Sequence, residues 1–119
     1  MKKILILMIL SCILVTGCSS DIEENNVNNT YIEMITTNEV KKIIDNYEEY
    51  SDTVIVDVRT LDEYESGHLK GAVNVPVSEI KNIDISKDKK IVVYCRSGSR
   101  SNTAAKELIK LGYEKVYDM

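Results

Sequence analysis

A single cysteine in this sequence stands where a thiol could act as a nucleophile. Cys95 follows the run Ile91–Tyr94, whose continuous apolar character predicts a short buried strand. After a few small residues comes a segment with apolar positions at helical spacing. A turn between a strand and a helix gathers backbone N–H groups, and the start of the helix adds partial positive charge. Both features stabilise an anion, so we expect Cys95 to have a lowered pKa and to react as a thiolate.

The residues after Cys95 favour chemistry over simple packing. They are small or basic, in the order Arg96, Ser97, Gly98, Ser99 and Arg100. The usual alternative is a buried structural cysteine, but that requires neither a glycine for close backbone approach nor two flanking arginines. We therefore take Cys95 as the candidate catalytic residue and the other five as candidate substrate-binding residues. Arg100, at the end of the loop, is the main charged candidate, whereas Arg96 could instead point to solvent.

The N-terminal end has the layout of a secretory signal peptide. Met1–Gly17 begins with a basic pair, continues with mostly apolar residues and ends with small ones. It is too short for an ordinary membrane span. Val15–Cys18 resembles the bacterial lipobox, which implies cleavage before Cys18 and a diacylglycerol anchor, carrying fatty acids such as palmitate, on its sulfur. The alternative is an uncleaved N-terminal anchor, and either predicts a domain held at the extracytoplasmic face of the cell membrane.

Charge and length predict one small acidic domain. The sequence has 119 residues with 15 basic and 19 acidic side chains, and loss of Lys2 and Lys3 with the signal leaves 13 basic ones. This balance argues against a nucleic-acid-binding surface. Residues 18–30 are polar, acidic and rich in asparagine, and they predict a flexible tether. The globular part is then a single domain over residues 31–119.

The cysteine count adds a constraint. Cys12 would leave with the signal and Cys18 would carry lipid, so Cys95 would be the only free thiol and no internal disulfide could form. One histidine and one free cysteine do not supply a closed metal site. No nucleotide-binding glycine pattern occurs either. We therefore expect neither a metal nor a cofactor.

Strand and helix signals alternate along the domain. Strands are expected at residues 31–35, 53–58, 72–76, 91–94 and 115–119, and helices beginning at Thr36, Thr60, Ser78 and Ser101. The pairs Thr36 with Glu39 and Thr60 with Glu63 form capping boxes. The helix after Thr36 is expected to bury one face, made of Val40, Ile43, Ile44 and Tyr47. Alternation of this kind predicts an α/β fold with a central parallel sheet flanked by helices. Ligands of such sheets bind beyond the carboxyl ends of the strands, where Cys95 and Arg59 both fall.

Two stretches closely resemble the rhodanese domain family. Asp57–Pro76 reads DVRTLDEYESGHLKGAVNVP, which is similar to the N-terminal motif of that family, and Tyr94–Ser101 reads YCRSGSRS, which resembles its active loop. The resemblance covers residues 31–119 and implies the rhodanese fold. It also implies a sulfurtransferase in which Cys95 takes sulfane sulfur from an anionic donor such as thiosulfate and becomes a persulfide. The acceptor would be a thiol, cyanide or a protein.

Other residues of the first motif are expected to shape the site. Asp57 and Arg59 follow a strand end, where a polar pair often pins neighbouring loops by hydrogen bonds, and Arg59 is also a candidate substrate-binding residue. His68 is expected to orient its neighbours, because a thiolate of low pKa needs no base. The remaining structural positions punctuate the backbone, namely Gly67, Gly71 and Pro76.

Two further functions remain open. Cysteine phosphatases and arsenate reductases on a rhodanese-like scaffold place one residue more between the cysteine and the arginine than the four between Cys95 and Arg100. The shorter loop suits one sulfur atom better than a tetrahedral oxyanion. The other function is a membrane-tethered, non-catalytic module that binds a partner protein, against which the presence of Cys95 argues.

The resemblance also implies a glycine pair and a final helix after the last strand. This sequence ends at Met119 without them. We therefore expect an α/β domain without the C-terminal helix, which would normally cover apolar surface. Either that element is dispensable here, or a partner chain covers the surface, or the sequence is a truncated product that keeps the motifs but whose activity is open.

Overall fold

The computed structural model describes residues 32–119. The expected signal peptide at 1–17, the tether at 18–30 and the lipidation site Cys18 lie outside the described residues and stay predictions. Among the helices within 32–119, none has the length and apolar character needed to cross a bilayer.

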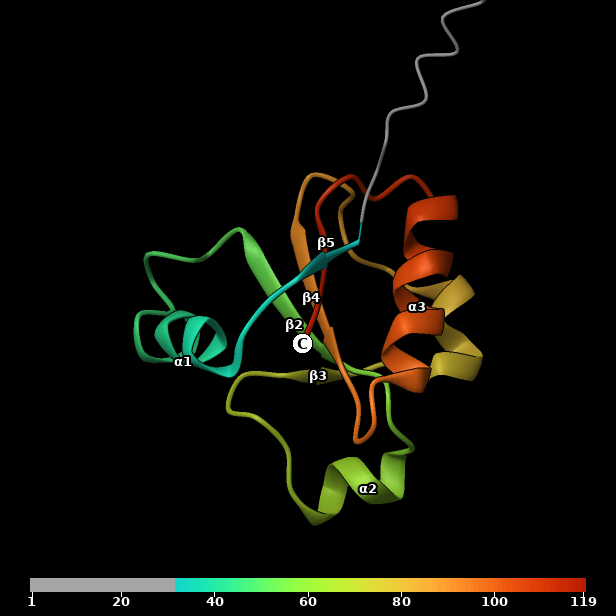
Figure 1. Cartoon of the computed structure of the whole chain (residues 1–119), viewed down its shortest axis with the longest axis horizontal. Helices are drawn as coiled ribbons and strands as arrows, with labels where there is room; N and C mark the ends of the chain where they lie inside the picture. The colour runs from blue at the N-terminus through green and yellow to red at the C-terminus, as the bar shows by residue number, and fades with distance from the viewer. Residues whose placement is uncertain (1–31) are drawn as a thin grey trace, which may run out of the picture.

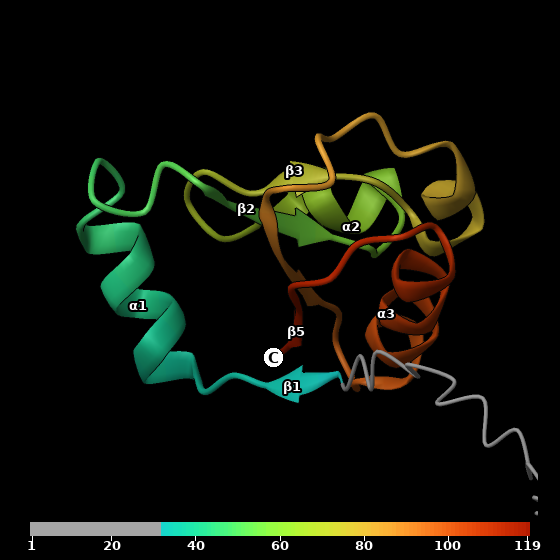
Figure 2. The ribbon, with the colours of Figure 1, turned by 90° about the horizontal axis from the view of Figure 1, so that it is seen from above.

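Five parallel strands form one sheet in the order β1-β5-β4-β2-β3. The strands are β1 Glu33–Met34, β2 Thr53–Asp57, β3 Val73–Asn74, β4 Lys90–Tyr94 and β5 Val116–Asp118. The α-helices are α1 Thr37–Asp45, α2 Leu61–Ser66 and α3 Ser99–Lys110, and a 3₁₀ helix, η1, spans Val77–Asn82. Figures 1 and 2 show α1 on one face of the sheet and α3 with η1 on the other. The predicted α/β fold with a central parallel sheet is confirmed.

Two apolar clusters hold the layers together. Val56, Val93 and Leu108 belong to the cluster between the sheet and α3, whereas Val40 and Val92 belong to the cluster on the α1 face. Successive residues of a strand point to opposite faces, so the central strand β4 feeds both clusters. Both faces of β4 are buried, as its continuous apolar sequence predicts. Cys95, the next residue, packs against the α3 cluster.

The two predicted capping boxes have different outcomes. At α1 the box is complete, because the Thr36 hydroxyl accepts the Glu39 N–H and the Glu39 carboxylate accepts the Thr36 N–H. At α2 the Thr60 hydroxyl accepts the Glu63 N–H at 3.3 Å, but the Glu63 carboxylate pairs with Arg100 instead. The second box is therefore only half formed, since a side chain distant in sequence takes the carboxylate.

Three sequence predictions about helices are wrong. Ser78 caps no helix, because η1 already begins at Val77, after Pro76, without a side-chain cap. Tyr47 does not face inward, since it lies beyond the end of α1 and is 54% exposed. Helix α3 begins at Ser99 and not at Ser101, after Gly98 with a φ of 86°. Its first residues are polar, so apolar periodicity could not reveal them.

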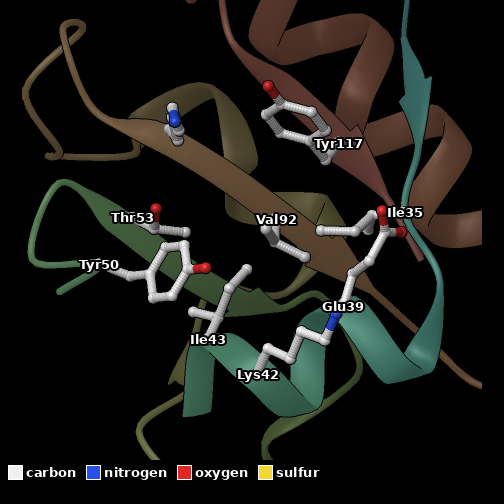
Figure 3. Close-up of a pocket in the computed structure, with 9 residues that line it drawn as sticks. Ile35, Glu39, Lys42, Ile43, Tyr50, Thr53, Val92 and Tyr117 are labelled. Atoms are coloured by element: carbon white, nitrogen blue, oxygen red, sulfur yellow. The ribbon is translucent and has the colours of Figure 1, made fainter. Parts of the chain in front are cut away.

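A hollow of about 340 Å³ lies on the α1 face of the sheet. Figure 3 shows the side chains that line it, among them Ile35, Ile43, Val92 and Tyr117. No residue of the Cys95 loop belongs to its lining, and Cys95 packs on the opposite face of the sheet. The hollow is therefore separate from the candidate site.

Candidate active site

The loop after β4 wraps around the sulfur of Cys95. The Gly98 N–H donates to Cys95 Sγ at 3.1 Å, and the Ser101 N–H donates to it at 3.3 Å. Gly98 adopts the left-handed conformation, which glycine tolerates best, and the chain turns there into α3. The sequence expectation that backbone donors gather around the thiol is confirmed. Cys95 is itself only partly buried, so the residue keeps some contact with solvent.

Hydrogen bonds from the loop lower the pKa of the Cys95 thiol. Burial by itself raises the pKa of Cys95, but hydrogen bonds from the Ser101 hydroxyl and N–H, and from the N–H groups of Gly98 and Ser97, outweigh it and lower the pKa. The start of α3 adds its partial positive charge. A thiolate held in this way is a ready nucleophile.

Ser101 is a site residue that the sequence reasoning missed. It is fully buried, and its hydroxyl donates to the Gly98 carbonyl oxygen at 3.1 Å. The same single proton can turn instead to the Cys95 sulfur, which is the hydroxyl hydrogen bond that lowers the thiol pKa. A small polar residue in the first turn of an α-helix, six positions after the cysteine, was the available signal. The loop thus contributes backbone donors and one adjustable hydroxyl.

The loop's other predicted residues are exposed or bind elsewhere. Arg96 and Ser99 are exposed, and so is Ser97, although its N–H contributes to lowering the Cys95 pKa. Arg100 was the main charged candidate for binding an anion. In the structure its Nη1 and Nη2 donate to the Glu63 carboxylate at 3.0 and 2.9 Å. Arg100 is thus held by an acidic partner on α2, and its role in binding an anion stays a prediction.

A buried polar network lies beside the loop at the carboxyl ends of β2 and β4. Asp57 and Tyr94 are directly paired across these strands, and the Tyr94 hydroxyl donates to Asp57 Oδ2 at 2.8 Å. Arg59 donates to the same carboxylate from its backbone N–H, at 2.9 Å, and from Nε and Nη2. Tyr94 immediately precedes Cys95, so this network fixes the strand end from which the loop starts.

The charges in this network set its proton affinities. Burial raises the pKa of the Asp57 carboxyl, but hydrogen bonds from Arg59 and Tyr94 outweigh it and lower the pKa. Burial also raises the pKa of Tyr94, to about 12, and the negative Asp57 adds to the increase. The carboxylate therefore stays ionised and the phenol stays neutral at physiological pH.

Arg59 occupies a structural position in this network. Its Nη2 donates to Asp57 at 2.7 Å and to the Gly67 carbonyl oxygen at 2.6 Å, which ties the end of β2 to the end of α2. The guanidinium is 18% exposed and lies 5.7 Å from the centre of the Tyr94 ring. The sequence suggested two roles for Arg59, pinning neighbouring loops and binding substrate. These contacts support the first role, and none of them supports the second.

The remaining motif residues form a scaffold on the same side of the domain. His68 stacks on Tyr64 with ring centres 3.6 Å apart, and its Nδ1 contacts the Tyr64 carbonyl oxygen at 2.8 Å. Gly71 has a φ of 80°, a conformation that favours glycine. Pro76 lies immediately before η1. None of these groups contacts the Cys95 sulfur among the described hydrogen bonds. Residues 32–119 hold no cluster of histidine, cysteine and carboxylate side chains that could bind a metal ion.

Comparison with known families decides the classification. A model described as "Rhodanese-like domain" matches residues 36–119, which include the loop and the polar network. The chain belongs to the rhodanese-like domain family. The fold seen here is accordingly the rhodanese-like α/β fold, and the resemblance of its two motifs to that family is confirmed.

Relatives of this rhodanese-like domain include proteins named for sulfur chemistry. It is 31% identical over 99 residues to the putative sulfur carrier protein YrkF of Bacillus subtilis, covering 82% of this chain and 52% of YrkF. It is 37% identical over 70 residues to a sulfurtransferase of Allochromatium vinosum, covering 57% of this chain and 65% of that protein. The chain spans little more than half the length of several curated relatives.

A solved structure supports the fold alone. The single domain sulfurtransferase RDL2 of Saccharomyces cerevisiae matches with a TM-score of 0.65 at 19% sequence identity. The match covers 74% of this chain and 82% of that one.

Proposed function

We propose that this rhodanese-like domain is a sulfurtransferase that carries sulfur as a persulfide on Cys95. Relatives named sulfurtransferase and sulfur carrier protein support the general function. The observation that carries the specific mechanism is the cradle of the thiol, in which Gly98 and Ser101 aim their N–H groups at the sulfur. The lowered thiol pKa and the partial exposure of Cys95 also favour a nucleophile.

The first half-reaction loads the sulfur. The Cys95 thiolate attacks the outer sulfur of a donor such as thiosulfate, and a new S–S bond forms. The S–S bond of thiosulfate breaks, and sulfite leaves with the electron pair. The negative charge now rests on the outer sulfur of the persulfide. The loop N–H groups and the start of α3 are placed to stabilise this charge.

The second half-reaction delivers the sulfur. A nucleophilic acceptor, either cyanide, a thiolate or an acceptor protein, attacks the outer sulfur of the persulfide. The S–S bond to Cys95 breaks, and the thiolate is regenerated with its electron pair. The loop binds an anion before and after the transfer, so it needs no proton donor. His68, which stacks on Tyr64 at a distance from these steps, keeps the orienting role expected from the sequence.

Mass spectrometry of the full-length chain tests this function. After incubation with thiosulfate or with a thiosulfonate, the proteolytic peptide that contains Cys95 should gain one sulfur atom. Cyanide should then remove that atom as thiocyanate. A sample whose thiols were alkylated before the donor was added is the control. A folded chain that gains no sulfur from either donor would contradict the proposal.

The alternatives from the sequence have less support. The loop shows two donors on one sulfur atom, and the arginine that would grip an oxyanion is bound to Glu63. This arrangement counts against phosphatase or arsenate reductase chemistry. A partly exposed and cradled thiol likewise counts against a purely non-catalytic binding module.

We further propose that the domain is anchored outside the cytoplasm by lipid on Cys18. The supporting observation is the order of a basic pair, an apolar run and the lipobox-like Val15–Cys18. We expect Cys18→Ala to abolish incorporation of radioactive palmitate in a bacterial host. In a detergent phase-partition experiment, the variant should move from the detergent phase to the aqueous phase. The Cys12→Ala variant is the matched control, because it removes a thiol inside the expected signal. Labelling that persists in Cys18→Ala would refute the anchor.

A further inference from the structure

Three arginines lie in or beside the candidate site, and Arg100 directly precedes Ser101, whose N–H donates to the Cys95 sulfur at 3.3 Å. Arg59 is bound to Asp57, and Arg96 is an exposed loop residue. Arg100 lies in the first turn of α3, and the negative charge of Cys95 contributes to the raised pKa of Arg100, after the larger effect of its hydrogen bonds to Glu63. Whether Arg100 is paired with a carboxylate therefore changes the positive charge that an incoming donor meets.

Glu63 neutralises Arg100 through two parallel hydrogen bonds. Arg100 Nη1 meets Oε1 at 3.0 Å, and Nη2 meets Oε2 at 2.9 Å, which is the strong bidentate geometry of a guanidinium with a carboxylate. Glu63 comes from α2 and Arg100 from α3, and Figure 1 shows α2 beyond the strand ends, next to the loop. The two side chains are 38% and 31% exposed, so the pair stands at the open side of the site.

This pairing changes what the site should accept. A dianion such as thiosulfate needs compensating positive charge in order to approach a thiolate. Here both arginines with well-defined contacts are already matched by carboxylates, Asp57 and Glu63. A donor with one negative charge is repelled less by the thiolate than a donor with two, so it needs less positive charge from the site.

We propose that Glu63 is a positioning residue that sets the charge of the sulfur donor. By holding Arg100 as a neutral pair, it favours monoanionic sulfane-sulfur donors, such as thiosulfonates and persulfides of small thiols, over dianionic thiosulfate. This inference rests on the proposed function and names its substrate class.

A matched pair of donors tests the inference. Methanethiosulfonate differs from thiosulfate by a methyl group in place of one charged oxygen. In both cases the thiolate forms an S–S bond with the outer sulfur, and methanesulfinate or sulfite leaves with the electron pair. In Glu63→Gln the guanidinium of Arg100 loses its charged partner. The ratio of kcat/KM for thiosulfate to that for methanethiosulfonate should then rise by about fivefold, the effect of one more unit charge about 4 Å away in a water-like dielectric.

Two variants show whether the effect passes through Arg100. Asp62→Asn removes the same charge from an exposed neighbour in the same turn of α2, and it should leave the ratio unchanged. In an Arg100→Ala background, Glu63→Gln should raise the ratio by less than it does in wild type, because no guanidinium is left to be released. An equal rise in Asp62→Asn, or in the Arg100→Ala background, would overturn the proposal, as would a constant ratio in Glu63→Gln itself.

A second readout is independent of sulfur transfer. Iodoacetate is an anion and iodoacetamide is neutral, and both alkylate a thiolate with loss of iodide. Glu63→Gln should raise the ratio of their rates at Cys95, measured on the peptide that contains it. If wild type gains no sulfur but this ratio rises, the sulfurtransferase proposal fails while the charge filter stands. If the ratio is unchanged, the charge filter fails whatever the sulfur assay gives.

Discussion

The Cys95→Ser variant should form no persulfide and should transfer sulfur no faster than donor and acceptor react without protein. A serine hydroxyl has the size of the thiol, but it is not ionised in this loop, and it cannot form the S–S bond that stores the sulfur. The N–H groups of Gly98 and Ser101 would still find an oxygen to bind. Activity should therefore disappear while the fold remains.

Two measurements separate chemistry from folding in this variant. Thiocyanate production with cyanide as acceptor reports transfer, and urea-induced unfolding reports stability. We expect the free energy of unfolding to stay within about 1 kcal/mol of wild type, because the substitution is nearly isosteric and its site is partly exposed. Transfer above the protein-free rate in a folded Cys95→Ser chain would remove Cys95 from the mechanism.

The Asp57→Asn variant should lose about 3 kcal/mol of stability, because removal of one partner from a buried ion pair leaves the other charge uncompensated. Asp57 is fully buried and receives hydrogen bonds from Arg59 and from the Tyr94 hydroxyl. The NH₂ group of an asparagine would face some of the N–H and O–H groups that now donate to the carboxylate, and those groups would lose their acceptor. Denaturant unfolding measures the loss. Asp62→Asn, the same change at an exposed position, should unfold at the wild-type denaturant concentration.

The contribution of Asp57 should also depend on pH in a defined direction. Its folded pKa lies below the unfolded value of about 4, so its stabilisation is complete above that pH. The stabilisation is lost as the pH falls through the lower folded pKa. The stability gap between wild type and Asp57→Asn should thus be constant from neutral pH to about pH 4 and narrow below it. A gap that grows on acidification would show that the carboxylate is not stabilised in its charged form.

Much of the fold could be predicted because local signals agreed with the global arrangement. The apolar runs of β2 and β4, the capping box at Thr36 and the alternation of elements all indicated an α/β domain with a parallel sheet. The loop after Cys95 was predictable for the same reason, since its donors come from the backbone and follow from the turn itself. Helix bounds were predicted less well, because polar residues such as Ser99 open α3 and because α1 ends before Tyr47.

The partners of the charged side chains could not be predicted in the same way. Arg100 and Glu63 lie 37 residues apart, and so do Tyr94 and Asp57. Sequence spacing gives no information on which of several carboxylates meets which guanidinium. A capping-box pattern even assigned Glu63 to its own helix. Such contacts depend on how α2 is placed against the loop, which is a tertiary property.

The strand order has a consequence for the folding of this domain. The sheet joins β1 to β5, so Glu33 of the first strand lies beside Tyr117 of the last. The first strand therefore stays without a partner until the last strand of the domain is in place. Closing so long a loop is slow. Until β5 pairs, one edge of β4 also remains open to strands of other chains, so the domain is most exposed to aggregation before its last strand is docked.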